Sequence, residues 1–280
     1  MSGLETFAVL GSGNLGSHIV EEFLSAKLPL TILTRDASKP ALQAYVQQGA
    51  RLKGVDYSSV DSIAEAFTGI DAVISALGPG HPPELPKDII RAAKKAGVKV
   101  VVPSEFGVDY EGPEAAPVPP GIQKKADLHN LAEDWLYYPD FGWDVPNRTV
   151  IFLNDGNTPI SVTDTRDVAT FVRQILTTQP IPEPGSGRTY RVEGYETTQL
   201  QALAALEKGV GEKFTIKHED YGKVAALQTE PSWAGLLAWL RAAAADGRQK
   251  LSTNDNAVVG FKARYTLEDT VREYLKTMEK

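Results

Sequence analysis

Five short apolar runs alternate with segments of helical periodicity in the amino-terminal part of the chain. The first run, FAVL from Phe7, leads into GSGNLGSHIVEEFLSA, where apolar residues recur at the three- and four-residue spacing of a helix. The alternation continues through PLTILTR, ARLKGVDY, DAVISALG and VKVVVPSEFG. Unbroken apolar strands are typical of a sheet that helices cover on both faces. The pattern therefore predicts an α/β fold built on a doubly wound parallel sheet.

Residues with strong helix-terminus preferences predict where several helices begin and end. Ser38 is the expected N-cap of the second helix, with Pro40 in its first turn, and Gly97 is the expected end of the fourth. Farther along, Thr163 is the expected N-cap of a helix over residues 164–177. The extended residues 160–162 before that helix are expected to return to the main sheet.

Three glycines form a G-x-G-x-x-G pattern between the first strand and its helix. In a dinucleotide site the first glycine makes a tight turn, the second lets the backbone approach a pyrophosphate, and the third lets helix and strand pack closely. The phosphate then lies at the helix N-terminus. The alternative is an ordinary strand-to-helix turn. The place of the pattern at the first crossover favours a Rossmann-like NAD(P)-binding site formed by Gly11, Ser12, Gly13, Asn14, Leu15 and Gly16.

The residues after the second strand distinguish between the two nicotinamide cofactors. An Asp or Glu there binds the ribose 2′-OH of NAD, whereas an Arg can accept the 2′-phosphate of NADP. This strand ends in Thr34-Arg35-Asp36, with Lys39 nearby. Because Arg35 comes first and Asp36 suits the dipole of the next helix, we expect NADP(H) bound by Arg35 and Lys39. The alternative makes Arg35 a solvated loop charge and Asp36 the ribose ligand of an NAD protein.

A second cofactor contact is expected where the fourth strand ends. Ala76, Leu77 and Gly78 lie there, followed by Pro79 and Gly80. Small residues at this position allow the adenosine side of a dinucleotide to pass close to the backbone. His81, which follows, either borders the pocket or serves only its loop.

The composition excludes several classes of protein. The 280 residues carry a formal net charge of -7 and include no cysteine. An acidic chain is a poor phosphate-backbone binder, so no nucleic acid partner is expected. Without cysteine there is neither a disulfide nor a thiolate nucleophile, which suits a reducing compartment. No apolar run approaches the roughly 18 residues of a membrane span, and the first residues lack signal-peptide features, so we expect no membrane contact and a cytoplasmic protein.

Several segments at matched spacing resemble one family. GSGNLG, LTR, VDYSS, DAVISALG and VVPSEFGVDY together resemble the isoflavone reductase-like group of the NmrA-like proteins, which are atypical short-chain dehydrogenase/reductases. The resemblance resumes at EDWLYYPDFGWD and DGNTPISVTDTRDVATFV and thins toward the carboxyl terminus. It implies an NADP-dependent oxidoreductase and includes Asp56 of VDYSS among the cofactor-binding residues. Typical short-chain dehydrogenases use Tyr-x-x-x-Lys, which this chain lacks, and this supports the atypical branch.

The resemblance also implies a catalytic lysine shortly after PSEFG. Lys125 matches it best, and Lys124 is one residue off. Hydride transfer to an electrophilic carbon leaves negative charge on an attached oxygen, and a lysine can donate a proton to it. We therefore expect Lys125 to be the general acid/base, with Ser104 hydrogen-bonded to the nicotinamide carboxamide or the substrate. The alternative is that both lysines belong to the charged first turn of a solvated helix.

Other side chains in this region are weaker candidates. His129 falls one helical turn after Lys125 and either assists it or is a partly buried helix position. Aromatic residues beyond it either wall a cavity for a flat ring or belong to the core. They are Trp135, Tyr137, Tyr138, Phe141 and Trp143.

The helix that carries Lys125 is expected to lack the strand that follows it in the resembling group. Relative to that group, a segment of roughly 15 to 20 residues near 132–133 is absent, which is enough for one strand with its turns. We expect residues 1–178 to form the NADP-binding domain and residues 179–280 a smaller α+β substrate domain to which 148–158 contributes. The smaller domain is expected to hold a strand near 188–193 and helices near 197–208 and 266–279.

Two hypotheses for function follow. The first is an NADPH-dependent reductase of a small aromatic or conjugated metabolite, with Lys125 as acid/base, acting as a possible homodimer. The second is a regulator of the NmrA type, which binds NADP(H) as a redox signal and acts through protein partners without turnover. The cleft between the two domains is the expected site in the first case.

Overall fold

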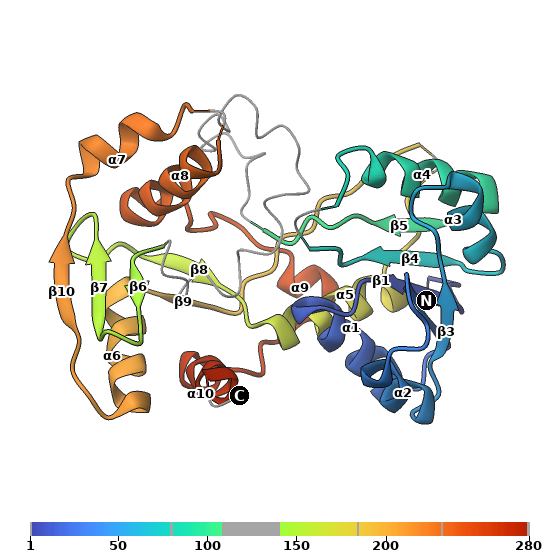
Figure 1. The fold of residues 1–280 in the computed structure, drawn as a ribbon, viewed down its shortest axis with the longest axis horizontal. Helices are drawn as coiled ribbons and strands as arrows, with labels where there is room; N and C mark the ends of the chain where they lie inside the picture. Colours follow the sequence, from blue (N-terminus) through green and yellow to red (C-terminus); the bar gives the residue numbers. More distant parts are fainter. Residues whose placement is uncertain (1, 79–80, 108–140, 184, 231, 279–280) are drawn as a thin grey trace.

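The computed structural model describes residues 2–78, 81–107, 141–183, 185–230 and 232–278. The amino-terminal lobe, at the right of Figure 1, is built on a five-stranded sheet. Its strands are β1 (Phe7–Leu10), β2 (Leu30–Thr34), β3 (Arg51–Gly54), β4 (Ala72–Ser75) and β5 (Val100–Val102). Its helices are α1 (Asn14–Ser25), α2 (Pro40–Gln47), α3 (Val60–Ala66) and α4 (Leu85–Ala96).

The sheet is parallel throughout and has the order β3-β2-β1-β4-β5. The chain therefore moves outward from β1 in one direction and, after β3, returns to place β4 on the other side of β1. Ligands of open α/β sheets bind at such a reversal, outside the carboxyl ends of the strands. The predicted doubly wound parallel sheet is confirmed.

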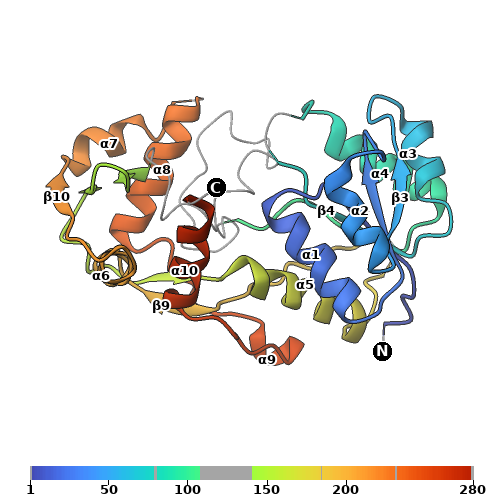
Figure 2. The ribbon, with the colours of Figure 1, turned by 60° about the horizontal axis from the view of Figure 1, so that its bottom comes forward.

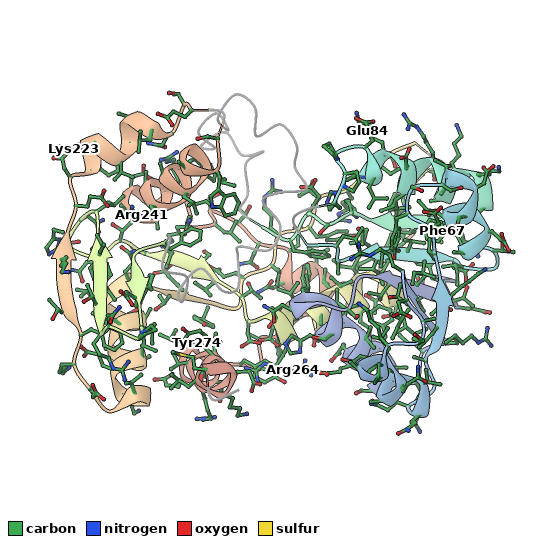
Figure 3. All side chains as sticks on the ribbon, in the orientation of Figure 1. Phe67, Glu84, Lys223, Arg241, Arg264 and Tyr274 are labelled. Atoms are coloured by element: carbon green, nitrogen blue, oxygen red, sulfur yellow. The ribbon has the colours of Figure 1, made fainter. Side chains whose placement is uncertain are left out.

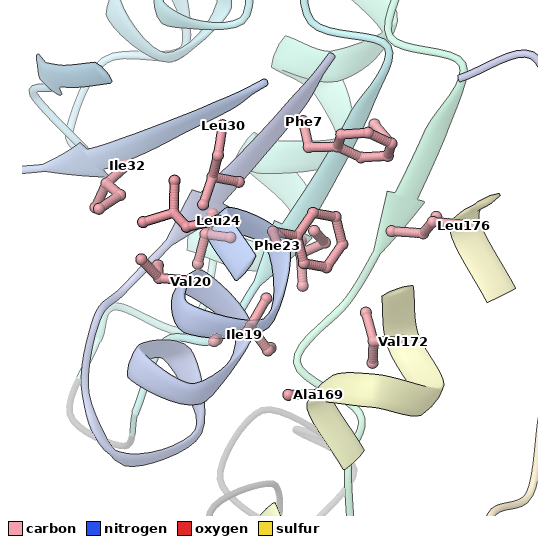
Figure 4. Packing of buried hydrophobic residues seen from close by; sticks show 14 of the residues in the cluster. Phe7, Ile19, Val20, Phe23, Leu24, Leu30, Ile32, Ala169, Val172 and Leu176 are labelled. Atoms are coloured by element: carbon pink, nitrogen blue, oxygen red, sulfur yellow. The ribbon is translucent and has the colours of Figure 1, made fainter. Parts of the chain in front are cut away.

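Both faces of this sheet are covered, as the apolar strands require. Along β1 the side chains alternate, so that Phe7 and Val9 join one cluster while Ala8 and Leu10 join another. In the first cluster Phe23 of α1 meets Phe7 edge to face, at 5.1 Å between ring centres. Figure 4 shows this cluster closed by Ala169, Val172 and Leu176 from a helix far along the chain. Helices α3 and α4 cover the opposite face.

That distant helix, α5 (Thr165–Thr178), lies beside α1 in the views of Figures 1 and 2. It belongs to the amino-terminal lobe by packing, although most of the second lobe follows it in sequence. Among the described residues, β3 and β5 are the two edge strands of the sheet. The segment in which we predict an absent strand lies outside the described residues, so that expectation stays a prediction.

The second lobe holds two small sheets and the remaining helices. One sheet has the order β10-β7-β6, and the other pairs β8 with β9. The strands are β6 (Trp143–Asp144), β7 (Thr149–Phe152), β8 (Ile160–Val162), β9 (Tyr195–Thr197) and β10 (Thr215–His218). The helices are α6 (Gln199–Val210), α7 (Tyr221–Leu227), α8 (Trp233–Asp246), α9 (Asn256–Val259) and α10 (Leu267–Met278).

The core of the second lobe combines residues that precede α5 in the sequence with residues that follow it. Trp143 and Phe152, which precede α5, pack with Leu206 and Trp239, which follow it. Phe141 and Trp143 are both buried in this core. Of the two roles left open for these aromatics, the structure supports the core role.

Two predicted helix N-caps are each wrong by one residue. The cap of α2 is Lys39 and not Ser38, whose hydroxyl instead donates to the Asp36 carboxylate in the preceding loop. The cap of α5 is Asp164 and not Thr163, because the Asp164 carboxylate accepts the Arg166 backbone N–H at 2.9 Å. Gly97 is confirmed as the end of α4, with a φ of 77° that favours glycine.

Two strand predictions in the second lobe are also wrong. Strand β8 does not join the main sheet but pairs antiparallel with β9. Residues 188–193 form no strand, because their backbone bonds to the loop before α9 instead. There Arg191 N–H donates to the Asp255 carboxylate at 2.8 Å, and Asp255 N–H donates to the Arg191 carbonyl at 2.7 Å.

A buried ionic seam joins the two lobes beside α1. Asp167 on α5 is fully buried and accepts the backbone N–H groups of Arg264 and Tyr265 at 2.9 and 3.1 Å. The Arg264 side chain reaches Glu22 of α1 at 3.4 Å, and Figure 3 shows it between the lobes. Burial raises the pKa of Asp167 despite these hydrogen bonds. The carboxylate thus fixes the segment before α10 against the amino-terminal lobe.

A second carboxylate, Asp71, stabilises the amino-terminal edge of the sheet, and its removal has a pH-dependent effect. It accepts the N–H groups of Glu5 and Thr6 at 2.8 and 3.1 Å and pairs with Lys99 at 2.7 Å. Burial opposes ionisation, but these contacts outweigh it and lower the pKa to about 2. Since the folded pKa is depressed, the stabilisation is present above the unfolded value near 3.8 and is lost as pH falls toward 2.

We therefore expect Asp71→Asn to lower the free energy of unfolding by about 1 to 2 kcal/mol at neutral pH and by much less at a pH of about 2. Urea unfolding at both pH values measures the difference. Asp61→Asn is the matched control, because Asp61 is 81% exposed and pairs only with Lys95 in the described structure. An Asp71→Asn effect that is equal at both pH values would contradict the assignment.

Candidate functional site

In the glycine turn between β1 and α1, the backbone lies in close contact with the backbone at the end of β4. Gly11 has a φ of 90°, and a Cβ there would lie 2.5 Å from the carbonyl oxygen of Ala76, at the end of β4. A Cβ on Gly16 would overlap the carbonyl oxygen of Gly11. Only glycine fits at these two positions, which bring β1, α1 and β4 together as the sequence pattern predicts.

Gly13 differs from its two neighbours in the pattern because it faces open space. It is the N-cap of α1, it makes no side-chain capping bond, and no heavy atom lies within 4 Å of the position that a Cβ would take. The first turn of α1 carries no acidic residue. The start of α1, with the positive end of its helix dipole, is therefore open to an anion at Gly13.

The other residues of the turn contribute differently. Ser12 is partly exposed and Asn14 is exposed, whereas Leu15 is buried in the core cluster with α5. Leu15 can therefore contact a cofactor only through its backbone.

A pocket of about 640 Å³ lies at the carboxyl ends of β2 and β3, at the same edge of the sheet as this turn. Arg35 and Asp56 both line it, as expected of cofactor-binding residues. Arg35 is exposed and makes no hydrogen bond or ion pair with any residue in the described part of the chain. Lys39 is exposed at the start of α2 and is not among the lining residues. The pocket therefore has one free cation on its wall within the described structure.

Asp36, the alternative ribose ligand, is used within its own loop. Its carboxylate accepts the Ser38 hydroxyl at 2.5 Å and the Ser38 backbone N–H at 2.9 Å. These bonds, with a smaller contribution from Lys39, lower the pKa of Asp36. A carboxylate held in this way favours Arg35 over Asp36 as the residue that meets the ribose.

Asp56 forms a similar turn after β3. Its carboxylate accepts the Ser58 hydroxyl and backbone N–H at 2.7 and 2.9 Å, and its own N–H donates to the Ser62 hydroxyl at 3.1 Å. The bonds from Ser58 lower the pKa of Asp56. The loop that borders the pocket therefore keeps a fixed backbone and an ionised carboxylate at neutral pH.

The ends of β4 and β5 meet through Ser104. Its hydroxyl, which is 9% exposed as a residue, donates to the Leu77 carbonyl at 3.2 Å. Exposure increases along the three residues that follow β4: Ala76 is buried, Leu77 is partly buried and Gly78 is exposed. Phe106 packs on the cluster beneath α1. The structure thus brings Ser104 next to the predicted cofactor segment, with its hydroxyl oxygen still able to accept a bond.

Several predicted site residues lie outside the described residues. They are Lys124, Lys125, His129, Pro79 and Gly80, and with them Trp135, Tyr137 and Tyr138. His81 is described, and its ring nitrogen Nδ1 lies 3.0 Å from the Pro82 carbonyl oxygen, a contact within its loop. In the described part of the chain no group of His, Asp and Glu side chains could hold a metal ion.

Sequence reasoning named two of the seven residues that line the pocket, Arg35 and Asp56, and missed the other five, among them Tyr57 and Pro82. The Tyr57 hydroxyl donates to the Leu33 carbonyl at 3.0 Å. The position of Tyr57 next to Asp56, just past the third predicted strand, was the available signal. Pro82 comes from the loop after β4 and gave no signal of its own.

A second pocket, of about 660 Å³, lies in the other lobe between β9, α6 and the start of α10. It includes Tyr195, Gln201 and Leu267 and shares no residue with the glycine turn. Because it lies in the second lobe, away from the carboxyl ends of the parallel strands, it is separate from the predicted cofactor site. None of the described helices combines the length and apolar character that crossing a bilayer requires.

Comparison with known proteins agrees with this geometry. A family model described as NAD(P)H-binding matches residues 11–179, which is more than half of the chain. The chain therefore belongs to this NAD(P)H-binding family. The match begins at the first glycine of the turn, just past β1, and ends just past α5. It therefore covers the rest of the parallel-sheet lobe together with β6, β7 and β8 of the second lobe.

The chain is also similar to individual proteins that are named oxidoreductases or reductases. It is 29% identical over 237 residues to an oxidoreductase aprR of Aspergillus flavus, covering 78% of this chain and 77% of that protein. It is 26% identical over 268 residues to a bifunctional pinoresinol-lariciresinol reductase 1 of Linum usitatissimum, covering 78% and 86%. A crystal structure of isoflavone reductase matches with a TM-score of 0.73 at 22% identity, over 97% of this chain and 99% of the other.

These comparisons confirm the resemblance to the isoflavone reductase-like group and identify the chain as an NAD(P)H-dependent oxidoreductase. The two curated relatives are named for redox chemistry. They therefore give no support to the alternative of a regulator without turnover.

Proposed function

We propose that the protein is an NADPH-dependent reductase of a small aromatic or conjugated metabolite. The observation that carries the cofactor preference is Arg35, an exposed guanidinium without a protein partner in the described structure, on the wall of the pocket at the carboxyl ends of β2 and β3. Its planar donors match the oxygens of a 2′-phosphate. The commitment of Asp36 to Ser38 supports the same preference.

Two residues are proposed to take part in the reaction. They are Ser104, just past the end of β5, and Lys125, farther along the chain. When bound, the nicotinamide supplies a hydride to an electrophilic carbon of the substrate. Ser104 is proposed to accept a hydrogen bond from the carboxamide while it donates to Leu77, which holds the ring in place. Lys125 is proposed to donate the proton to the oxygen that gains charge. An enone or an aromatic carbonyl provides both the electrophilic carbon and that oxygen.

We propose the second lobe as the substrate domain, divided from the first near residue 178. Residues 148–158 are proposed to belong with it, because Val150 and Phe152 pack in the same core as Leu206. A homodimer and a cytosolic location remain predictions. Light scattering tests the first, and the complete lack of cysteine is the basis of the second.

Replacing Arg35 tests the cofactor preference. We expect Arg35→Ala to weaken NADPH binding about 10- to 100-fold, since the charge-assisted bonds to a 2′-phosphate are lost, and to change NADH binding by less than about twofold. Fluorescence titration with each nucleotide measures both constants. Arg51→Ala is the matched control, because Arg51 is also exposed but lies at the opposite, amino end of β3. Equal losses for NADPH and NADH would contradict the proposal.

The reaction itself is tested by turnover. We expect the purified protein to oxidise NADPH in the presence of some members of a panel of enones and aromatic carbonyl compounds, and to use NADH much less well. Saturated aliphatic ketones serve as the control panel. Tight NADPH binding without oxidation by any member of either panel would count against the reductase.

A further inference from the structure

Tyr57 connects the loop after β3 to the strand that carries Arg35. Its hydroxyl donates to the carbonyl oxygen of Leu33, two residues before Arg35, at 3.0 Å. Next to this contact, the Val55 N–H donates to the Thr34 carbonyl at 2.9 Å. Two hydrogen bonds thus hold the last two residues of β2 against the loop that lines the pocket.

The backbone on the other side of Arg35 is also held. The Asp36 N–H donates to the Thr34 hydroxyl at 3.2 Å, and the Asp36 carboxylate is bound to Ser38. Arg35 is therefore a residue with a fixed backbone on both sides and a side chain without a protein partner in the described structure. This is the arrangement of a preorganised cation, in which little backbone freedom is lost when an anion binds.

The Tyr57 side chain is suited to this task. Its ring packs against the cluster that contains Leu33 and Val55, and burial raises its pKa to about 12 although the charge of Arg35 acts in the opposite direction. The hydroxyl therefore stays protonated at neutral pH and remains a donor.

We propose that Tyr57 is a positioning residue for NADP(H) selectivity, which sets the place of the Arg35 guanidinium at the 2′-phosphate through its bond to the Leu33 carbonyl. This inference rests on the proposed NADPH preference and extends it to a second residue that lines the same pocket and acts through the backbone before Arg35. Tyr57 belongs to the loop of β3, whereas the cation that it positions belongs to β2. The selectivity for NADPH over NADH thus depends on Tyr57, after β3, as well as on Arg35, after β2.

A double-mutant cycle tests the inference, with NADPH and NADH as the probes. We expect Tyr57→Phe, which keeps the ring and removes only the hydroxyl, to weaken NADPH binding about three- to tenfold and to leave NADH binding within about twofold. In the Arg35→Ala background the same change is expected to have no effect on NADPH binding, because the group that Tyr57 positions is gone. Tyr45→Phe is the control, since Tyr45 is also a partly buried tyrosine but lies on α2, outside the pocket.

Each outcome is informative. Because the NADPH to NADH ratio is measured within one variant, a loss of folded protein changes both constants and leaves the ratio unmoved. Equal losses for the two nucleotides, no loss at all, or a loss that persists in the Arg35→Ala background would overturn the role of Tyr57 while the NADPH preference stands. If Arg35→Ala leaves the ratio of the wild type unchanged, the cofactor assignment fails, and the role of Tyr57 fails with it.

Discussion

Gly13→Ala is expected to fold like the wild type and to bind NADPH about 10- to 100-fold more weakly. A methyl group at this position meets no protein atom within 4 Å, and the backbone already has a negative φ of -75° that alanine adopts. The methyl group instead occupies the space through which a pyrophosphate reaches the N–H groups at the start of α1. Isothermal titration with NADPH, together with a thermal unfolding curve, measures both properties.

Gly16→Ala is the matched control, with the opposite expectation. Its methyl group would overlap the Gly11 carbonyl oxygen, so strand and helix must move apart. We expect a loss of about 2 to 4 kcal/mol in unfolding free energy. If Gly13→Ala binds NADPH as tightly as the wild type, the phosphate does not lie at this helix N-terminus.

Lys125→Ala is expected to lower kcat about 100- to 10,000-fold and to leave the NADPH dissociation constant within about twofold. The reason is chemical: without the ammonium group no side chain in the proposed scheme gives a proton to the oxygen that gains charge. Rapid-mixing measurement of a single turnover, with cofactor binding measured separately, distinguishes the two effects.

Lys124→Ala is the neighbouring control. The resemblance that selects Lys125 places Lys124 one residue off, so its loss is expected to reduce kcat by less than about tenfold. Equal effects of the two changes would show that the lysines act only through their summed charge. Full activity of Lys125→Ala would remove this residue from the mechanism.

The amino-terminal lobe was predictable because the sequence patterns that define its strands and helices are local. Each apolar run is one buried strand, and the alternation of runs with helices leaves few ways to arrange a parallel sheet. The glycine turn was predictable for the same reason, because the roles of Gly11 and Gly16 follow from the strand before them and the helix after them. Arg35 and Ser104 were found because each lies just past the end of a strand.

The wrong predictions depend on contacts between distant segments or on a choice between neighbours. Whether β8 pairs with the main sheet or with β9 depends on a strand more than thirty residues later, which the pattern of residues 160–162 does not contain. Asp164 lies beside an equally suitable threonine, whereas at α2 the better capping residue, Ser38, is bound by Asp36; hydrogen bonds of the folded loop decide both cases. The bond from Tyr57 to Leu33 spans 24 residues and is likewise invisible in the sequence.

The central claim, that this chain transfers a hydride from NADPH to a small substrate, is tested most directly by an isotope. Purified protein is incubated with NADPH in which both hydrogens on the hydride-donating carbon of the nicotinamide are deuterium, together with the enone and aromatic carbonyl panel, and the masses of the products are measured by mass spectrometry. We predict one deuterium in the product on the electrophilic carbon, and about 10- to 100-fold less labelled product when Gly13→Ala replaces the wild type at limiting cofactor. NADPH that binds tightly but keeps its deuterium with every compound would contradict the claim.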